Sequence, residues 1–209
     1  MKQRGRKDSS HCSGRGRRTY RHQCLRPRLA VVAVACLLMG LPSMHGQHSK
    51  PTEYEVKATY LYSFGKFVDW PAKGTTGQSE SFAICVLGQD PFGPALDAAL
   101  SDETVAGKRV VAKRIPTPKD ALNCRVLFIS SSEDPRLKQI LTTLADASIL
   151  TVSDLPKFTQ RGGMVQFILE GNRIRFEVNL VSAGHAGLTL SSELLKVAVN
   201  VRSSGRLGD

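Results

Sequence analysis

The sequence EYEVKATYLYSFGKFVDWP, residues 53–71, decides how the folded part of this chain is built. It holds six aromatic side chains, almost half of the eight Phe, four Tyr and one Trp in the whole chain. Its apolar residues recur at helical spacing, and the apolar surface that they form is wide. The segment should end at Trp70-Pro71, because a proline moves the residue before it out of the helical conformation. We therefore expect a helix that is buried, either in the core of its own domain or against another protein.

The start of the chain is typical of a secretory signal peptide. Residues 1–28 contain ten Lys or Arg and one acidic residue, and an apolar run from Leu29 to Leu41 follows. A basic region, a short apolar region and a break, in this order, predict a signal peptide over residues 1–46, cleaved between Ser43 and Gln47. The expected destination is the periplasm. The competing interpretation is an uncleaved anchor, although the run is shorter than the about 20 apolar residues of a membrane span.

The formal net charge of +11 invites a nucleic-acid interpretation, but the leader supplies most of it. Ten of the 29 basic residues and one of the 18 acidic residues lie in the leader. The remaining 19 basic and 17 acidic residues nearly balance, which is ordinary for a soluble surface. A dense basic stripe of the kind that binds phosphates is not expected, so nucleic acid is excluded as a partner.

After residue 48 the chain retains two cysteines, Cys85 and Cys124, and one histidine, His185. Zinc sites normally use closely spaced pairs of ligands, so no metal site is expected. In an exported protein two cysteines more naturally form a disulfide, and both lie in strand-like segments that could be neighbours. Two buried free thiols are the alternative. The sequence contains no G-x-S-x-G motif whose serine could pair with His185 in a catalytic triad. We therefore expect no catalytic residue and no cofactor.

The pattern of the remaining chain predicts an α/β fold. Strand-like and helix-like segments alternate up to about residue 152, and a hairpin turn at Gly171-Asn172 follows. We expect one domain over residues 53–200, between a linker at 47–52 and a flexible tail at 201–209. Its architecture should be a three-layer sandwich with a mixed, mainly parallel sheet and a C-terminal β-hairpin plus helix. The expected strands are Ser81–Leu87, Lys108–Ile115, Cys124–Ser130, Ser148–Val152, Met164–Leu169 and Arg173–Asn179, and the later helices are Phe92–Leu100, Ser132–Ala145 and a segment that begins near Ser191.

Several blocks of the sequence together resemble the YfiR family of exported bacterial domains. They are EYEVKATYLYSFGKFVDWP, FAICVLGQDPFG, CRVLFIS, GGMVQFILEGNRIRFEVNL and AGLTLSSELLKVA, in this order. The resemblance implies a periplasmic repressor that binds the sensor part of an inner-membrane diguanylate cyclase and lowers cyclic di-GMP, with an effect on biofilm. It also implies an outer-membrane lipoprotein that can sequester the repressor. Some members have a second cysteine pair, for which this chain has no residues.

If the protein works by docking, the partner should meet exposed apolar surface, and a homodimer is a further expectation. The candidates come from the aromatic helix and from the C-terminal segment, and for each the alternative is ordinary core packing. The partner-binding candidates are Tyr62, Phe67, Trp70, Leu188, Ser191 and Leu195.

The second hypothesis is a small-molecule-binding module that feeds a membrane sensor such as a histidine kinase. Its ligand would occupy the crevice at the carboxyl ends of the parallel strands, with Gln89 and Arg175 as candidate contacts. Few polar residues converge near those strand ends, which favours the docking hypothesis.

Overall fold

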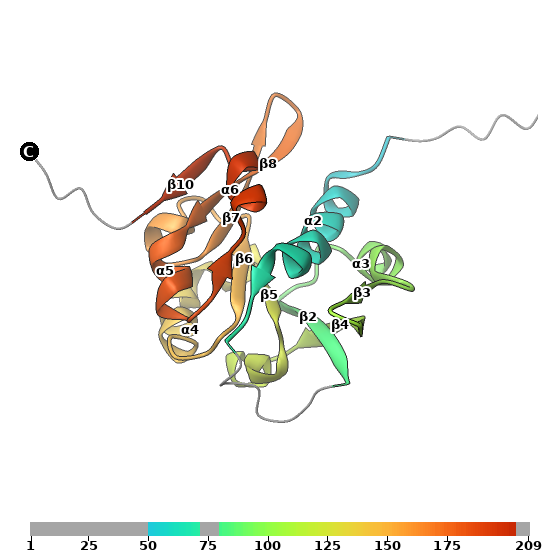
Figure 1. Cartoon of the computed structure of the whole chain (residues 1–209), viewed down its shortest axis with the longest axis horizontal. Helices are drawn as coiled ribbons and strands as arrows, with labels where there is room; N and C mark the ends of the chain where they lie inside the picture. Colours follow the sequence, from blue (N-terminus) through green and yellow to red (C-terminus); the bar gives the residue numbers. More distant parts are fainter. Residues whose placement is uncertain (1–49, 72–79, 204–209) are drawn as a thin grey trace, which may run out of the picture. The chain divides into compact units, whose positions relative to one another are not determined.

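The computed structural model describes residues 50–71 and 80–203, which fold around an eight-stranded sheet (Figure 1). The strands lie in the order β10-β8-β7-β6-β5-β2-β4-β3. Their bounds are β2 Ser81–Leu87, β3 Thr104–Val105, β4 Lys108–Ile115, β5 Val126–Ile129, β6 Leu150–Ser153, β7 Val165–Glu170, β8 Arg173–Asn179 and β10 Asn200–Arg202.

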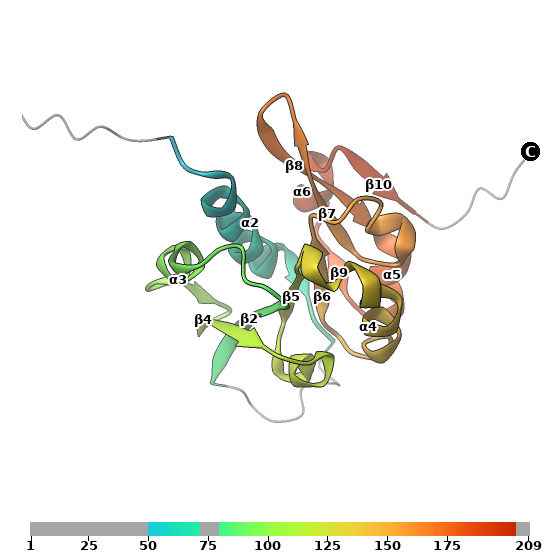
Figure 2. The same cartoon turned by 180° about the vertical axis from the view of Figure 1, so that it is seen from behind.

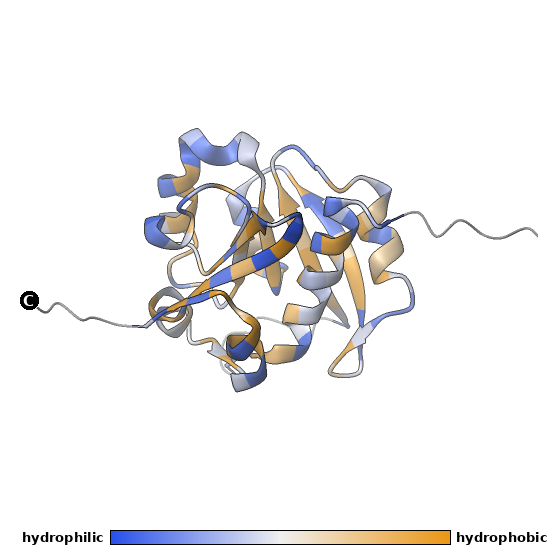
Figure 3. Ribbon diagram, turned by 90° about the horizontal axis from the view of Figure 1, so that it is seen from above, coloured by the Kyte–Doolittle hydropathy of each residue, from blue (hydrophilic) through white to orange (hydrophobic). Residues whose placement is uncertain are grey.

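The middle of this sheet is parallel and its margins are mixed. Strands β4, β2, β5, β6 and β7 run parallel, whereas β3 pairs antiparallel with β4 and β8 pairs antiparallel with β7. Every residue of β5 is buried, as expected for a parallel strand covered on both faces, and the central strands are largely orange in Figure 3. Strand β8, which lies between β7 and the edge strand β10, instead alternates between exposed and buried residues along its first half.

Helices cover both faces of the sheet. The helices are α2 Glu53–Phe67, α3 Pro94–Leu100, α4 Leu137–Thr143, α5 Leu180–His185 and α6 Ser192–Val197, with 3-10 helices η1 Pro118–Asn123, η2 Ser131–Arg136 and η3 Thr159–Arg161. Apolar residues of α2, α3, α5 and α6 join one hydrophobic cluster with one face of the sheet. Residues of η1 and α4 join a second cluster with the other face of the sheet. Figure 2 shows the molecule from the side opposite to Figure 1. The predicted three-layer α/β sandwich with a mixed, mainly parallel sheet is therefore confirmed.

Two helices start or stop at residues other than the predicted ones. Helix α2 ends at Phe67, before the proline, because Val68–Asp69 form β1, a short strand that pairs antiparallel with β9 (Thr189–Leu190). Helix α3 begins at Pro94, because the Asp90 carboxylate accepts a hydrogen bond from the Phe92 backbone N–H and turns that segment away from a helix.

Three further elements differ from the prediction. The helix expected from Ser132 begins as η2, and regular α-helix starts only after Pro135, whose ring lacks an N–H for helical hydrogen bonding. Helix α5 was missed, because its sequence LVSAGH continues directly from a strand and its only cap is Asn179. Strand β10 extends to Arg202, so two residues assigned to the flexible tail belong to the sheet.

The predicted signal peptide, residues 1–46, lies outside the described residues. Within residues 50–71 and 80–203, no helix has the length and apolar character that crossing a membrane requires.

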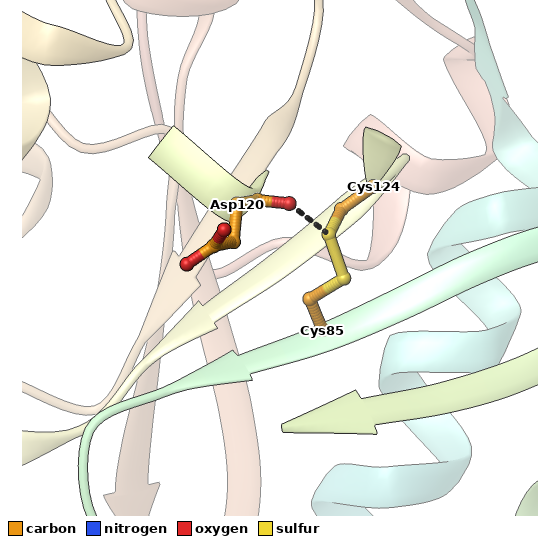
Figure 4. Close-up of a disulfide and its surroundings, with 3 residues drawn as sticks. All are labelled: Cys85, Asp120 and Cys124. Atoms are coloured by element: carbon orange, nitrogen blue, oxygen red, sulfur yellow. Dashed lines mark hydrogen bonds between the residues drawn. A yellow bond between two sulfur atoms is a disulfide. The ribbon is translucent and has the colours of Figure 1, made fainter. Parts of the chain in front are cut away.

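The two cysteines that follow the leader are joined in a disulfide, as the disulfide hypothesis proposed (Figure 4). Cys85 lies in β2 and Cys124 directly follows η1, and their Cα atoms are 6.0 Å apart. Both residues are buried in the cluster that packs beneath α4. The carbonyl oxygen of Asp120 lies 4.0 Å from the Cys124 sulfur. The bond therefore holds η1 against the central strand β2 from inside the core.

Removing this disulfide should destabilise the domain without changing its fold. The bond closes a loop with a sequence separation of 39 residues. Opening a loop of this size costs about 4 kcal/mol in the chain-entropy account of disulfides. We expect the free energy of unfolding, measured with urea, to fall by about this amount in the variant in which Cys85 and Cys124 are both replaced by Ala. Addition of a reductant should destabilise the wild type and leave the double variant unchanged. Equal stability of the two proteins without reductant would contradict the prediction.

Candidate interaction surface

Helix α2 begins at a well-defined residue. Thr52 and Glu55 form a capping box, in which the Thr52 hydroxyl accepts from the Glu55 N–H and the Glu55 carboxylate accepts from the Thr52 N–H. A capping box satisfies two backbone donors that the helix itself cannot. It thereby fixes the residue at which α2 begins.

The inward side of α2 is held by an aromatic cluster. The Phe64 ring lies 5.2 Å from the Phe176 ring and 5.8 Å from the Phe167 ring, measured between centroids. Tyr60 lies beside the same two strand residues, at 5.7 Å from Phe176 and 6.0 Å from Phe167. Rings at these separations attract one another beyond the effect of burial alone. The cluster therefore fixes the middle of α2 against β7 and β8.

A buried charge fixes the first turns of α2. The ammonium nitrogen of Lys57 lies 2.7 Å from an Asp154 carboxylate oxygen and 2.6 Å from a Glu53 carboxylate oxygen, although the Lys57 side chain is only 3% exposed. The Tyr54 hydroxyl donates to the same Asp154 oxygen at 3.2 Å. Asp154 directly follows β6, so this cluster links α2 to the carboxyl end of a parallel strand.

The electrostatics of this cluster favour a charged Lys57. Burial alone would lower the pKa of Lys57, but the hydrogen bonds to Asp154 and Glu53 outweigh burial, and the pKa is raised above its ordinary value. Burial raises the pKa of Tyr54, and the negative charge of Asp154 raises it further. Both groups therefore keep their protons at neutral pH, and Lys57 carries its positive charge inside the domain.

A hairpin formed by β7 and β8 protrudes near the start of α2. Strands β7 and β8 are joined at Gly171 and Asn172, whose φ angles of 55° and 59° suit a tight two-residue turn (Figure 1). Leu169 lies one residue before the end of β7 and is 59% exposed. An apolar side chain is therefore presented next to the tip of the hairpin.

A hollow of about 500 Å³ lies between this hairpin and the start of α2. Its apolar lining comes from Val56, Tyr60, Leu169 and Ile174. The hollow continues into a second one of about 260 Å³ along the outward side of α2, as far as Ser63. Together they form a groove, which we call the α2–hairpin groove. The residues that line it are Lys50, Pro51, Glu53, Glu55, Val56, Thr59, Tyr60, Ser63, Leu169, Asn172, Arg173, Ile174 and Arg175.

Three of the six predicted partner-binding residues pack into the domain. Tyr62 and Leu188 are buried, at 7% and 5% exposed, so core packing describes them better than docking. Trp70 is partly buried, with its ring edge-to-face against Phe82 at 5.4 Å, and its Nε1 is buried with no hydrogen-bond partner within the described part of the chain.

The other three lie together, although they come from opposite ends of the domain. The Ser191 N–H donates to the Phe67 carbonyl at 2.9 Å, which places the end of α2 beside the start of α6. The Ser191 hydroxyl also caps α6 by accepting from the Leu194 N–H. Phe67 is 40% exposed, and Leu195 is partly buried one turn along α6. We call Phe67, Ser191 and Leu195 the α2–α6 patch.

The two predicted ligand contacts are not brought together. Gln89 follows β2, and its N–H donates to the Ser132 hydroxyl at 2.9 Å. Arg175 lies in β8, with strands β5, β6 and β7 between β2 and β8 in the sheet, and it lines the α2–hairpin groove.

Protein groups also fill the turn that follows β2. The Arg114 guanidinium pairs with Asp90 and Asp97 and donates to the Gly93 carbonyl. These contacts fasten the turn to β4.

Sequence reasoning missed Lys57, Asp154 and Leu169. Lys57 carried a usable signal, because it lies three residues after Tyr54 and four before Leu61, so its charge falls on the apolar side of a helix. Asp154 and Leu169 carried none, since only the fold places them next to α2. Among residues 50–71 and 80–203, no group of three or more His, Cys, Asp or Glu side chains is arranged to hold a metal ion.

Comparison with known proteins finds a family over most of the chain. The model of a family described as YfiR/HmsC-like matches residues 54–199. Among solved structures the chain is similar to a conserved domain protein from Vibrio cholerae O1 biovar El Tor, with 11% sequence identity, a TM-score of 0.48 and coverage of 74% of this chain and 62% of that one. It is also similar to the ABC domain in complex with L-Trp from Streptococcus pneumonia, with 10% identity, a TM-score of 0.47 and coverage of 69% and 60%. The chain thus spans less than two thirds of the length of each of these two solved chains.

The Lys57 cluster predicts a specific pattern of stability changes. Asp154→Asn should lower the free energy of unfolding by about 3 kcal/mol, because it leaves a buried ammonium with one carboxylate instead of two. Lys57→Met combined with Asp154→Leu should cost clearly less than Asp154→Asn alone, because it removes both charges and fills their volume. Urea unfolding of the three proteins measures the difference. A cost below about 1 kcal/mol for Asp154→Asn would mean that the pair behaves like an exposed one, contrary to this account.

Proposed function

Because this chain belongs to the YfiR/HmsC-like family, we propose that it is a periplasmic regulator that binds the sensor region of an inner-membrane diguanylate cyclase and represses it. The match over residues 54–199 is the observation that carries the proposal, since it covers nearly all of the described domain. In this role the protein lowers cyclic di-GMP and so limits biofilm formation. An outer-membrane lipoprotein that binds the regulator would release the cyclase.

The buried disulfide supports export. Bonds of this kind form and persist in oxidising compartments such as the bacterial periplasm and are rare in the cytosol. Cys85 and Cys124 are both buried, so reduction would have to reach the inside of the fold. The periplasmic location and the cleaved leader are parts of the proposal.

Repression requires the regulator to prefer one state of its partner. A bound protein shifts a two-state equilibrium only by the difference between its affinities for the two states. The regulator therefore binds the inactive arrangement of the sensor region more tightly than the active one. No reaction is needed for this effect, and the domain contributes surface rather than chemistry.

The α2–α6 patch is the surface that we propose for this contact. It joins an aromatic side chain at the end of α2 to a helix that continues to Val197, which is 61% exposed. Exposed apolar side chains grouped on neighbouring elements are typical of protein-binding surfaces. A second copy of the chain could cover the same surface, so a homodimer belongs to this proposal as well.

The proposed function is tested by measuring cyclic di-GMP in cells. Deletion of the gene should raise the nucleotide level, and reintroduction of the wild type should restore it. Phe67→Ser should restore it poorly, because it removes an exposed apolar contact. Leu122→Ser is the matched control, because Leu122 is 60% exposed on η1 and lies outside the patch. Both variants should melt within about 2 °C of the wild type, since neither side chain is buried.

Two results would count against the proposal. An unchanged nucleotide level on deletion, with the candidate cyclase genes present and expressed, would remove the repressor function. Full repression by Phe67→Ser, alongside loss of repression by Leu122→Ser, would move the contact away from the α2–α6 patch.

A further inference from the structure

The α2–hairpin groove is elongated. Its two hollows share Pro51, Val56 and Tyr60, and the smaller one follows the outward side of α2 from Pro51 to Ser63. A compact ligand would fill one hollow and leave the other empty. An extended or helical chain segment could lie along both, as segments do in other grooves beside helices.

The rim of the groove carries unbalanced positive charge. Lys50, Arg173 and Arg175 line it, and within residues 50–71 and 80–203 none of the three forms a salt bridge. Glu170 stands opposite Arg173 in the hairpin register, yet no ion pair joins them. Glu53 and Glu55 also line the groove. The Glu53 carboxylate is paired with Lys57 at 2.6 Å, and the Glu55 carboxylate accepts a hydrogen bond from the Thr52 N–H, so the three basic side chains still outnumber the acidic ones.

Apolar side chains lie beneath this rim. Val56 and Tyr60 are partly buried and pack against the core, so they form a fixed floor. Leu169 projects from the hairpin with 59% of its surface exposed, whereas its register partner Ile174 is only 8% exposed. The groove therefore offers an apolar floor, one projecting apolar side chain and three cations that form no salt bridge with the described part of the chain.

We propose that the α2–hairpin groove binds a segment of the partner protein that has an apolar side and acidic residues beside it. Leucine-like side chains would cover Val56, Tyr60 and Leu169, and carboxylates would pair with Arg173 and Arg175, which can bind them in a bidentate manner. This inference rests on the proposed function for the identity of the partner, but the chemistry of the segment follows from the groove. The groove shares no residue with the α2–α6 patch and gives the partner a second point of contact.

The test uses two synthetic probes and the isotopically labelled full-length protein. One probe is an amphipathic peptide of leucine, alanine and glutamate of about 11 residues, the length of the part of α2 from Glu53 to Ser63 that lines the groove. The other has lysine at every glutamate position. The acidic peptide should shift the NMR signals of Val56, Tyr60, Leu169 and Arg173, and the basic peptide should bind about tenfold more weakly.

Charge reversal makes the test independent of folding. In the double variant Arg173→Glu, Arg175→Glu, the preference should invert, so that the basic peptide binds more tightly than the acidic one. A misfolded variant could not produce that inversion. Lys138→Glu is the control, because Lys138 is exposed on α4 and lies outside the groove. Equal shifts by both peptides, shifts elsewhere in the protein, or an unchanged preference in the double variant would overturn the proposal.

Failure of this inference can be distinguished from failure of the proposed function. If deletion of the gene raises cyclic di-GMP while the double charge-reversal variant represses like the wild type, the regulator function stands and the groove inference fails. If deletion has no effect, the regulator function fails, and the peptide titration still decides whether the groove selects acidic apolar segments.

Discussion

The side chain of Lys57 can stay charged inside the domain only while the carboxylates of Glu53 and Asp154 remain beside it. Taking an ammonium group out of water is costly, and two short ion pairs offset that cost. One carboxylate belongs to α2 itself and the other follows β6, so the requirement holds the first turns of the helix at the carboxyl end of that strand. The aromatic cluster around Phe64 then determines how the rest of α2 lies across β7 and β8.

This fixed position gives α2 two different sides. The inward side is part of the core, whereas the outward side contributes to the α2–hairpin groove and ends at Phe67 in the α2–α6 patch. The hairpin and α6 belong to the last third of the chain, yet both reach the same helix. A partner that touches this region therefore contacts the first helix and the C-terminal elements together. A helix with so many aromatic residues is understandable in these terms, because some of them hold the fold and at least one remains at the surface.

The sequence was sufficient to predict the fold class but not to predict which side chains are exposed at the surface. Alternation of strands and helices, the apolar run in β5 and the turn at Gly171-Asn172 each carry a local signal, and all three predicted the observed elements. The end of α2 was misplaced because β1 forms only through pairing with β9, more than 100 residues later. In the same way, nothing local to Tyr62 distinguishes it from Phe67, although one is buried and the other exposed. Exposure depends on what the rest of the chain places above each side chain, and that is a property of the folded domain.

The central claim is that this protein acts by docking through the outward side of α2 and the elements beside it. The most direct measurement places a photoreactive amino acid at position 67, 169 or 122, in place of Phe67, Leu169 or Leu122, and identifies by mass spectrometry what each becomes attached to in living cells. The account predicts that positions 67 and 169 attach to the periplasmic region of the same inner-membrane signalling protein and that position 122 does not. Attachment from position 122 alone, or attachment of positions 67 and 169 only to residues of the same chain, would contradict it.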